Sequence, residues 1–338
     1  MGVLWVSAGL LVVGAILLDA TLTTLSLAGR AGWLTRHVSH GVWRLIRGLA
    51  GRGPRRHRVL RWSGTSVLVA TFAAWVTGLW LGWLLVFDAT PDAVLDRFGR
   101  PADGWSRFYY TGFSIFTLGV GDYTPGTTGA QLATNGAVLT GLFLVTLGIT
   151  YLMQVVSAVV DKRTIAGHVS ALGADPADIV RRGWADGQFS PMFTQHLTSL
   201  TPELVRLGER HLAFPVLHFF HADSRGRSAP AAVTVLDGAL LLLRCGVDGR
   251  HRPDVGAVEP LSRALEQLVG TLDGSFIVAA DDPVRAPCLR DLSRAGIPTT
   301  HEQAYAEAVE GTRTHRCRLR GWCASDGWDG ADPKLTLG

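Results

Sequence analysis

Three long runs of apolar residues divide the first half of the chain. They cover residues 3–28, 63–87 and 135–160. Asp19 is the only charged side chain inside them. A helix needs about 20 apolar residues to cross the hydrocarbon core of a bilayer. The pattern therefore predicts an all-α membrane protein with a first transmembrane helix in 1–28, an outer helix at 63–87 and an inner helix at 134–160.

The second half of the chain follows another pattern. Beyond residue 160, apolar residues recur at the intervals of three and four that are typical of amphipathic helices. We expect helices at 174–184, 192–207, 209–220, 231–244, 255–272, 284–295 and 302–312. Residues 161–338 are predicted to form a mainly helical domain of their own.

Charge differs sharply between the two connecting segments. Residues 29–62 are rich in arginine, whereas residues 88–104 carry more aspartate than arginine. Arginine-rich loops stay on the cytoplasmic side. The N-terminus is therefore predicted outside the cell membrane and 161–338 inside. The net charge of +4 is localised in this way, which favours a membrane surface over a nucleic acid as the partner.

The basic segment 29–62 also has a helical apolar pattern. Its members are Trp33, Leu34, Val38, Val42, Trp43, Leu45 and Ile46. A basic amphipathic helix can lie on the inner leaflet and bind anionic headgroups. The alternative is that these arginines only set the topology.

Asp19 is an acid within a predicted membrane helix, where it shares a helical face with Thr23 and Ser26. An intramembrane acid is a functional candidate by default. Hydrogen bonding between helices near the inner boundary explains it as well, and the sequence leaves its role open.

A short aromatic segment lies between the second and third apolar runs. Residues 105–116 include Trp105, Tyr109 and Tyr110, and the segment is too short to cross a bilayer but long enough for a re-entrant helix. Thr-Leu-Gly-Val-Gly-Asp follows at 117–122. Glycines at alternate positions reach φ values closed to other residues, so successive carbonyls can point the same way. Such a row can replace the water shell of a cation, with the negative end of the short helix aimed at it.

This arrangement resembles the pore domain of the tetrameric potassium channel family, over residues 63–160. The resemblance implies a pore helix at 105–116 and a selectivity filter at 117–122. By position, Thr117, Leu118, Gly119, Val120 and Gly121 would bind K⁺ through their oxygens. Asp122, Trp105, Tyr109 and Tyr110 would support the filter from behind. K⁺ would be the only cofactor, with no other metal and no organic group.

Val120 departs from the pattern of that family, which usually has tyrosine and occasionally phenylalanine at this position. Coordination by backbone carbonyls does not need the ring, but the aromatic cuff around the filter is thinner. A weakly selective cation channel is therefore the nearest alternative to a potassium channel.

The inner helix carries two candidates for a gating hinge, because the family's inner helix bends at a glycine. Counting from Asp122 favours Gly141, whereas the run after Gly148 resembles the hinge neighbourhood. Close helix packing explains either glycine equally well, and the sequence does not choose between them.

The chain has one pore segment, and a ring of carbonyls around an ion takes about four. We therefore expect a homotetramer that conducts K⁺ passively and is modulated by its cytoplasmic domain. A second alternative is a membrane-anchored sensor or scaffold with a silent pore. No nucleophile, base and orienting acid can be assembled by spacing, and no Gly-x-Gly-x-x-Gly or Walker motif occurs, so no enzyme is predicted.

Overall fold

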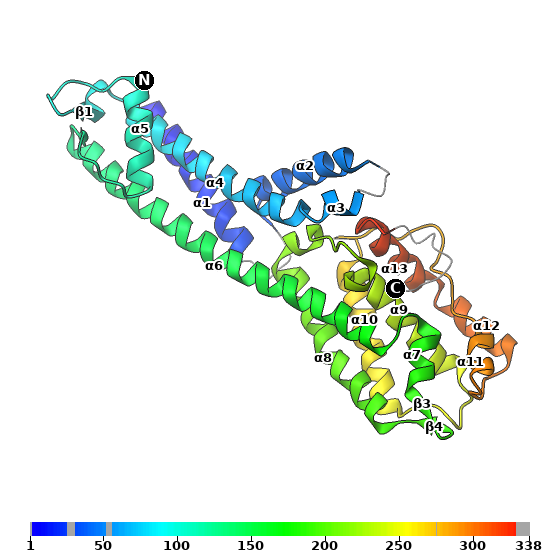
Figure 1. Ribbon diagram of the computed structural model, residues 1–338. Helices are drawn as coiled ribbons and strands as arrows, with labels where there is room; N and C mark the ends of the chain where they lie inside the picture. Colours follow the sequence, from blue (N-terminus) through cyan, green and yellow to red (C-terminus); the bar gives the residue numbers. More distant parts are fainter. Residues whose placement is uncertain (1, 26–30, 52–55, 275, 329–338) are drawn as a thin grey trace. The chain divides into compact units, whose positions relative to one another are not determined.

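The computed structural model describes residues 2–25, 31–51, 56–274 and 276–328 (Figure 1). Within these ranges helices dominate, and the strands form only two short antiparallel pairs. The predicted all-α fold class is confirmed. The predicted boundary at 28/29, together with Ser26, lies outside the described residues.

The described residues contain four helices that are long and apolar enough to cross a membrane. They are Gly2–Leu25, Arg56–Phe87, Thr128–Leu172 and Ala229–Gly246. The fourth differs from the others because 83% of its apolar window is buried inside the protein. A helix that is apolar all round and covered by protein is a core helix, so Ala229–Gly246 belongs to the interior of the C-terminal part.

The chain divides into two compact units, each described here by itself. Unit 1 comprises residues 1–45 and 65–155, and unit 2 comprises residues 46–64 and 156–338. Residues 46–51 and 56–64 belong to the predicted basic segment and to the start of the predicted outer helix. In the structure they group with the C-terminal residues in unit 2.

Unit 1 is built on three long helices. They are α1 (Gly2–Leu25), α4 (Ser63–Phe87) and α6 (Thr128–Leu172), joined by the first part of α2 (Trp33–Ala50) and by α5 (Gly104–Ile115). Helix α1 packs closely on α4, because a Cβ at Gly9 would lie 2.6 Å from the Gly82 carbonyl oxygen. Small residues permit such an approach between membrane helices.

A short antiparallel strand pair lies at the end of unit 1 where α5 begins (Figure 1). After the turn η1 (Pro91–Ala93), strand β1 (Val94–Asp96) pairs antiparallel with β2 (Tyr123–Pro125), with Leu95 opposite Thr124. Because β2 directly follows residues 117–122, this strand pair anchors the far end of that segment.

Helix α6 is longer than the predicted inner helix 134–160. It runs without a break over 45 residues, about 68 Å at 1.5 Å per residue. A bilayer core is about 30 Å thick, so α6 extends well past it. The predicted pore helix 105–116 corresponds to α5, which begins and ends one residue earlier.

Unit 2 surrounds the buried helix α9 (Ala229–Leu241), which continues into a π-helical turn, η4 (Leu242–Gly246). The remaining elements are α3 (Arg56–Leu60), α7 (Pro176–Gly183), the hairpin β3 (Trp184–Ala185) and β4 (Gln188–Phe189), α8 (Pro191–Ala213), η2 (Pro215–Phe219), η3 (Arg225–Arg227), α10 (Val255–Leu272), α11 (Leu289–Arg294), α12 (Glu302–Gly311) and α13 (Arg313–Ser325). Helices α8 and α10 pack along each other.

In unit 2 the expected helix 192–207 is present, whereas the expected helices 209–220 and 284–295 are only partly helical. The expected helices 192–207 and 209–220 are one helix, α8, which passes through Gly208 and is followed by the short 3-10 turn η2. Of the expected helix 284–295 only α11 is helical. Periodicity alone does not separate a helix from an irregular segment that buries the same apolar residues.

Candidate pore site

The start of α5 is fixed by its cap and by an ion pair. The Asp103 carboxylate accepts the backbone N–H of Ser106 at 2.8 Å, and the hydrogen bonds with Ser106 lower the pKa of Asp103 below its usual value. Arg107 pairs with Asp88 at 3.1 Å and donates to the Pro91 carbonyl at 3.0 Å. These contacts tie the first turn of α5 to the loop that follows α4.

Helix α5 is held against α4 by a tryptophan. The Trp80 indole donates its N–H to the Phe108 carbonyl at 3.1 Å, and its ring stacks on the Phe108 ring at 4.8 Å. A Cβ at Gly112 would overlap the Trp80 ring. Glycine at this position therefore lets α5 pack directly on the aromatic face of α4.

Tyr110 is the buried anchor of α5 on the side of α6. Its side chain is 1% exposed, and its hydroxyl lies 2.5 Å from that of Thr134. The ring meets Phe87 and Phe113 edge to face. Aromatic pairs of this kind add specific geometry to the burial of apolar area, so Tyr110 sets how α5 sits between α4 and α6.

The backbone of residues 117–122 has an unusual conformation. After α5 ends, the Leu118 N–H donates to the Phe113 carbonyl at 2.8 Å. The φ angles of Thr117, Gly119 and Gly121 are then 58°, 59° and 85°. Residues with positive φ thus recur at alternate positions. Glycine tolerates this conformation, whereas for a β-branched threonine it is strained and points to a functional constraint.

The segment 117–122 is exposed in the single chain. The side chain of Leu118 is 65% exposed and that of Val120 is 47% exposed. Its far end is anchored through Tyr123, whose hydroxyl lies 2.9 Å from that of Ser106 at the start of α5. The segment is therefore held at both ends, and its own backbone is uncovered.

The predicted support residues are in different environments. Tyr110 is buried between α5 and α6, and Tyr109 makes edge contacts with Phe113 and Tyr123. Trp105 is 75% exposed and stacks on Phe108. Within the described ranges, Asp122 has no hydrogen bond to another residue. Bracing by Asp122 stays a prediction.

The sequence interpretation missed several residues that position this segment. They are Trp80, Ser106, Arg107, Tyr123 and Thr134. The sequence could have indicated Tyr123, because the residue that directly follows the segment is placed to hold its C-terminal end. The partners of Trp80 and Thr134 lie on other helices and have no mark in the local pattern.

Both hinge candidates are packing positions in the structure. A Cβ at Gly141 would overlap the Ile115 carbonyl at the end of α5, and a Cβ at Gly148 would lie 2.5 Å from the Phe72 ring on α4. Helix α6 continues through both. The contact of Gly141 places α6 directly against the end of the pore helix.

Asp19 is buried at the beginning of α2. It accepts hydrogen bonds from the Leu34 N–H at 2.8 Å, the Thr35 N–H at 3.3 Å, the Thr35 hydroxyl at 2.7 Å and the Trp75 indole at 2.9 Å. The residue before the helix is Gly32, and a Cβ there would overlap the Asp19 carboxylate. Asp19 on α1 thus caps α2 from a distance and joins it to α4.

Helix α2 has exposed residues of two kinds. Trp33, Leu45 and Leu49 are exposed apolar side chains, and Arg36, Arg44 and Arg47 are exposed basic ones. The predicted amphipathic helix is present.

Within the residues that the structure describes, no cluster of His, Cys, Asp or Glu could hold a metal ion.

Two comparisons with known proteins match this chain. A family model described as "Ion channel" matches residues 67–158, which include most of α4, all of α5, residues 117–122 and the first part of α6. The protein "Uncharacterized membrane protein YdjJ" of Bacillus subtilis (strain 168) is 31% identical over 318 residues, 94% of this chain and 92% of the relative. No solved structure matches.

Proposed function

From the premise that this chain belongs to the family of multi-pass membrane proteins that includes Bacillus subtilis YdjJ, with an ion-channel domain at residues 67–158, we propose that it is a homotetrameric potassium channel. Ions would pass down their gradient through a filter formed by residues 117–122. The chain would act as a passive conductor and not as an enzyme.

The observation that carries the proposal is the uncovered backbone at 117–122, with left-handed residues at every second position. Irregular backbone at membrane depth is stable only where protein buries it or where it lines a water-filled path. Other copies of the chain would supply that protein. The carbonyls of Thr117, Leu118, Gly119, Val120 and Gly121 would then face the path and replace the water around K⁺.

Helix α5 supports cation binding electrostatically. It ends at Ile115, immediately before the filter segment. The C-terminal end of a helix carries a partial negative charge. This end of the helix would therefore favour a cation on the inner side of the filter.

Selectivity depends on the width of the ring of carbonyls. Val120 offers a short side chain at the position where the potassium channel family has an aromatic ring, and on α5 the rings of Tyr110 and Phe113 pack against each other. We propose that this packing keeps the filter narrow enough to prefer K⁺. A weakly selective cation channel is the competing function, because a thinner cuff restrains the backbone less.

Helix α2 would bind anionic lipid at the cytoplasmic face of the cell membrane, with the N-terminus of α1 outside. The exposed arginines and apolar side chains of α2 support this proposal. The contact of Asp19 with the first turn fixes where this helix begins. Replacing Arg36, Arg44 and Arg47 by glutamine should lower binding of the protein to vesicles that contain anionic lipid. Equal binding of variant and parent would contradict it.

The decisive experiment measures ion flux in liposomes. Purified protein is reconstituted with K⁺ inside, and flux is referenced to valinomycin with Na⁺ as the competing ion. The test variant is Gly119→Ala. Its matched control is Gly99→Ala, because Gly99 in the outer loop also has a positive φ and open space around its Cα. Both substitutions strain the backbone, but only one lies in the filter.

We expect K⁺ flux that exceeds Na⁺ flux, is lost in Gly119→Ala and survives in Gly99→Ala. Equal flux of both ions would replace the potassium channel by the weakly selective channel. Absence of flux in the full chain and in a chain that ends after residue 172 would favour the silent-pore scaffold.

A further inference from the structure

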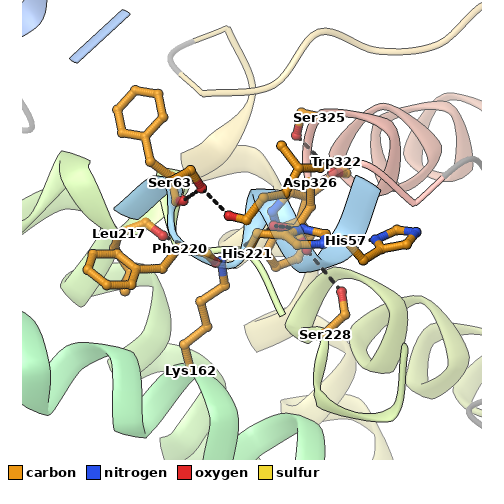
Figure 2. A network of polar contacts seen from close by, with 12 residues as sticks. His57, Ser63, Lys162, Leu217, Phe220, His221, Ser228, Trp322, Ser325 and Asp326 are labelled. Carbon is orange, nitrogen blue, oxygen red and sulfur yellow. Dashed lines mark hydrogen bonds and ion pairs between the residues drawn. The ribbon is translucent and has the colours of Figure 1, made fainter. Parts of the chain in front are cut away.

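The polar groups around Lys162 in unit 2 bind one another. Lys162 donates to the Phe220 carbonyl at 2.8 Å and lies 3.8 Å from Asp326, which accepts the Ser228 hydroxyl at 3.0 Å (Figure 2). Contacts of this kind stabilise a fold and do not require a ligand. Unit 1 differs, because three of its helices leave an apolar hollow between them.

A cavity of about 430 Å³ lies between α1, the end of α4, the loop that follows α4 and the start of α6. This is the size of a site for a small ligand. Each of the three helices is long and apolar enough to cross a membrane, so the cavity lies at membrane depth. Its apolar walls include Val6 and Leu10 from α1, Trp83 and Phe87 from α4, and Leu132 and Ala133 from α6.

The polar lining of the cavity is at one end. Thr90 and Thr127 are its only lining residues with hydroxyl groups, and they lie just after α4 and just before α6. The indole of Trp83 donates to the Thr140 hydroxyl at 2.9 Å. From Thr127 to Ala133 the cavity follows α6 for about 9 Å at 1.5 Å per residue. It therefore extends from the membrane boundary into the upper part of one leaflet, which is about 15 Å thick.

Helix α1 is fixed on α4 at both ends of the cavity wall that it forms. A Cβ at Gly2 would lie 3.0 Å from the Ala89 carbonyl oxygen, and a Cβ at Gly9 would lie 2.6 Å from the Gly82 carbonyl oxygen. Such close contacts leave α1 little freedom to move into the hollow. Protein interiors contain few voids larger than a water molecule, so a hollow of this size between fixed helices indicates an occupant.

The chemistry of the walls selects the occupant. Apolar cavities do not hold water, and the liquid that surrounds a protein at this depth is lipid hydrocarbon. The Thr127 oxygen accepts the Ala130 N–H at 3.1 Å, which leaves its O–H to donate. A phospholipid has ester carbonyls at the membrane boundary and hydrocarbon below them, in the same order as the lining. A side chain from a second copy would fill the apolar part but would not require hydroxyls at its upper end.

We propose that this cavity binds one acyl chain of a phospholipid from the leaflet on the side of residues 88–104, with the ester group at Thr90 and Thr127. Two of the walls belong to the ion-channel match at residues 67–158, whereas Val6 and Leu10 come from the helix that precedes it. The bound chain would hold α1 against the start of α6. The site rests on the membrane location of unit 1 and does not depend on ion conduction.

The test labels the full chain with a photoreactive lipid. The protein is reconstituted in phosphatidylcholine vesicles that contain an increasing fraction of phosphatidylcholine with a diazirine on the upper part of one acyl chain. The headgroup has no net charge, so the arginines of α2 do not enrich the probe. Mass spectrometry then locates the adducts after irradiation.

A bound lipid and the surrounding lipid differ in how labelling depends on the fraction of probe. Labelling of Leu10 and Leu132 should saturate, because a site holds one chain. Leu11 is the reference at the same depth on α1, since it is 74% exposed and does not line the cavity. Its labelling should rise in proportion to the probe.

The first filling variant is Gly129→Leu. Gly129 lines the cavity, and a Cβ there would contact only the Thr127 hydroxyl, at 3.9 Å. Its matched control is Gly14→Leu, which adds the same side chain to α1 at an exposed glycine with nothing within 4 Å of the added Cβ. Saturable labelling of Leu10 should fall several-fold in Gly129→Leu and persist in Gly14→Leu.

A second pair of variants fills the cavity from α1. Val6→Phe enlarges a lining residue, and Val3→Phe makes the same change one turn earlier at a residue that is 81% exposed and outside the cavity. We expect loss of saturable labelling of Leu132 in Val6→Phe and none in Val3→Phe. This pair decides the proposal if Gly129→Leu does not fold.

Thermal unfolding in detergent gives an independent readout. A lipid that binds the folded chain raises its midpoint temperature by mass action. Added phosphatidylcholine should raise it in the parent, Gly14→Leu and Val3→Phe, and clearly less in the two filling variants. An equal rise in all five proteins would overturn the site.

Three labelling results would also overturn it. Proportional labelling of Leu10 and Leu132 in the parent would show ordinary surrounding lipid. Absence of labelling at both residues would show that a second copy of the chain covers the cavity. Saturable labelling that survives in both Gly129→Leu and Val6→Phe would place the bound lipid elsewhere.

Discussion

Two buried acids, one in each unit, are stabilised in different ways. Asp19 in unit 1 is 1% exposed and is surrounded by neutral donors: backbone N–H groups, a hydroxyl and an indole. Asp326 in unit 2 is 3% exposed and has Lys162, His221 and the Ser228 hydroxyl around it.

The difference follows from the polar and charged groups that are present in each unit. A membrane segment has no water and few charges, so a carboxylate there depends on fixed dipoles such as the first turn of a helix. A globular domain can bury an ion pair, but each charge then depends on the other. The first arrangement positions α2, and the second joins the C-terminus to α6.

The largest effect is expected when Asp326 is replaced by alanine. Lys162 is then left in a buried site without a carboxylate, and breaking a buried pair in this way costs about 3–5 kcal/mol. Hydrogen exchange of α9 amides in the full chain measures the loss. The matched variant Asp326→Ala with Lys162→Met should recover much of it. A single variant as stable as the parent would show that the pair contributes little.

A somewhat smaller effect is expected for Asp19→Ala. The indole of Trp75 and the first N–H groups of α2 then lose their acceptor, and leaving buried donors unpaired costs about 1–3 kcal/mol. Amides of the first turn of α2 should exchange faster, while α9 is unaffected. Asp19→Asn keeps one acceptor oxygen and should lie between parent and Ala variant. Equal protection of α2 in all three proteins would contradict capping by Asp19.

Acid titration should also distinguish the contribution of Asp326 to stability from that of Asp19. The pKa of Asp326 is lowered in the folded protein, so its stabilising effect is full above the carboxyl pKa of the unfolded chain. This effect is lost as pH falls through the lowered folded value. Unit 2 should therefore lose stability in strong acid. Denaturant unfolding of the parent and of Asp326→Asn along a pH series measures this. The slope in the strongly acidic range should be smaller in the variant.

The smallest effects are expected when one neutral donor is removed from each acid. Thr35→Val removes a hydroxyl from Asp19, and Ser228→Ala removes one from Asp326. Each acid keeps its other donors, so each single loss should cost about 0.5–1.5 kcal/mol. Thr35→Val should have the larger effect of the two, because Asp326 retains Lys162. Exchange of α2 and of α9 reports the two sites independently, and the reverse order would contradict this comparison.

Several elements could be predicted because a single property decides them. The length of the uncharged apolar run predicts α4 at residues 63–87, and the short aromatic segment before the two alternate glycines predicts α5. The ends of α6 were not predicted. Lys162 and Arg163 are charged residues that normally follow a membrane span, yet the helix continues to Leu172 because unit 2 packs on its last turns.

The candidate site was predicted in part for the same reason. The positions of Gly119 and Gly121 are local, since alternate glycines next to a short helix already specify a special backbone. The contact of Tyr110 with Thr134, and the tight fit of Gly141 against Ile115, depend on which helices meet. Those contacts arise between residues far apart in the chain.

The sequence by itself determined the long apolar helices, the short helix before residues 117–122 and the helical character of the rest, because hydropathy and glycine spacing act within a few turns. Only the tertiary structure decided that Asp19 caps α2, that Ala229–Gly246 is a core helix and that His57 meets His221. Buried polar groups must find partners wherever the fold brings them together, and the local pattern contains no information about which partners those are.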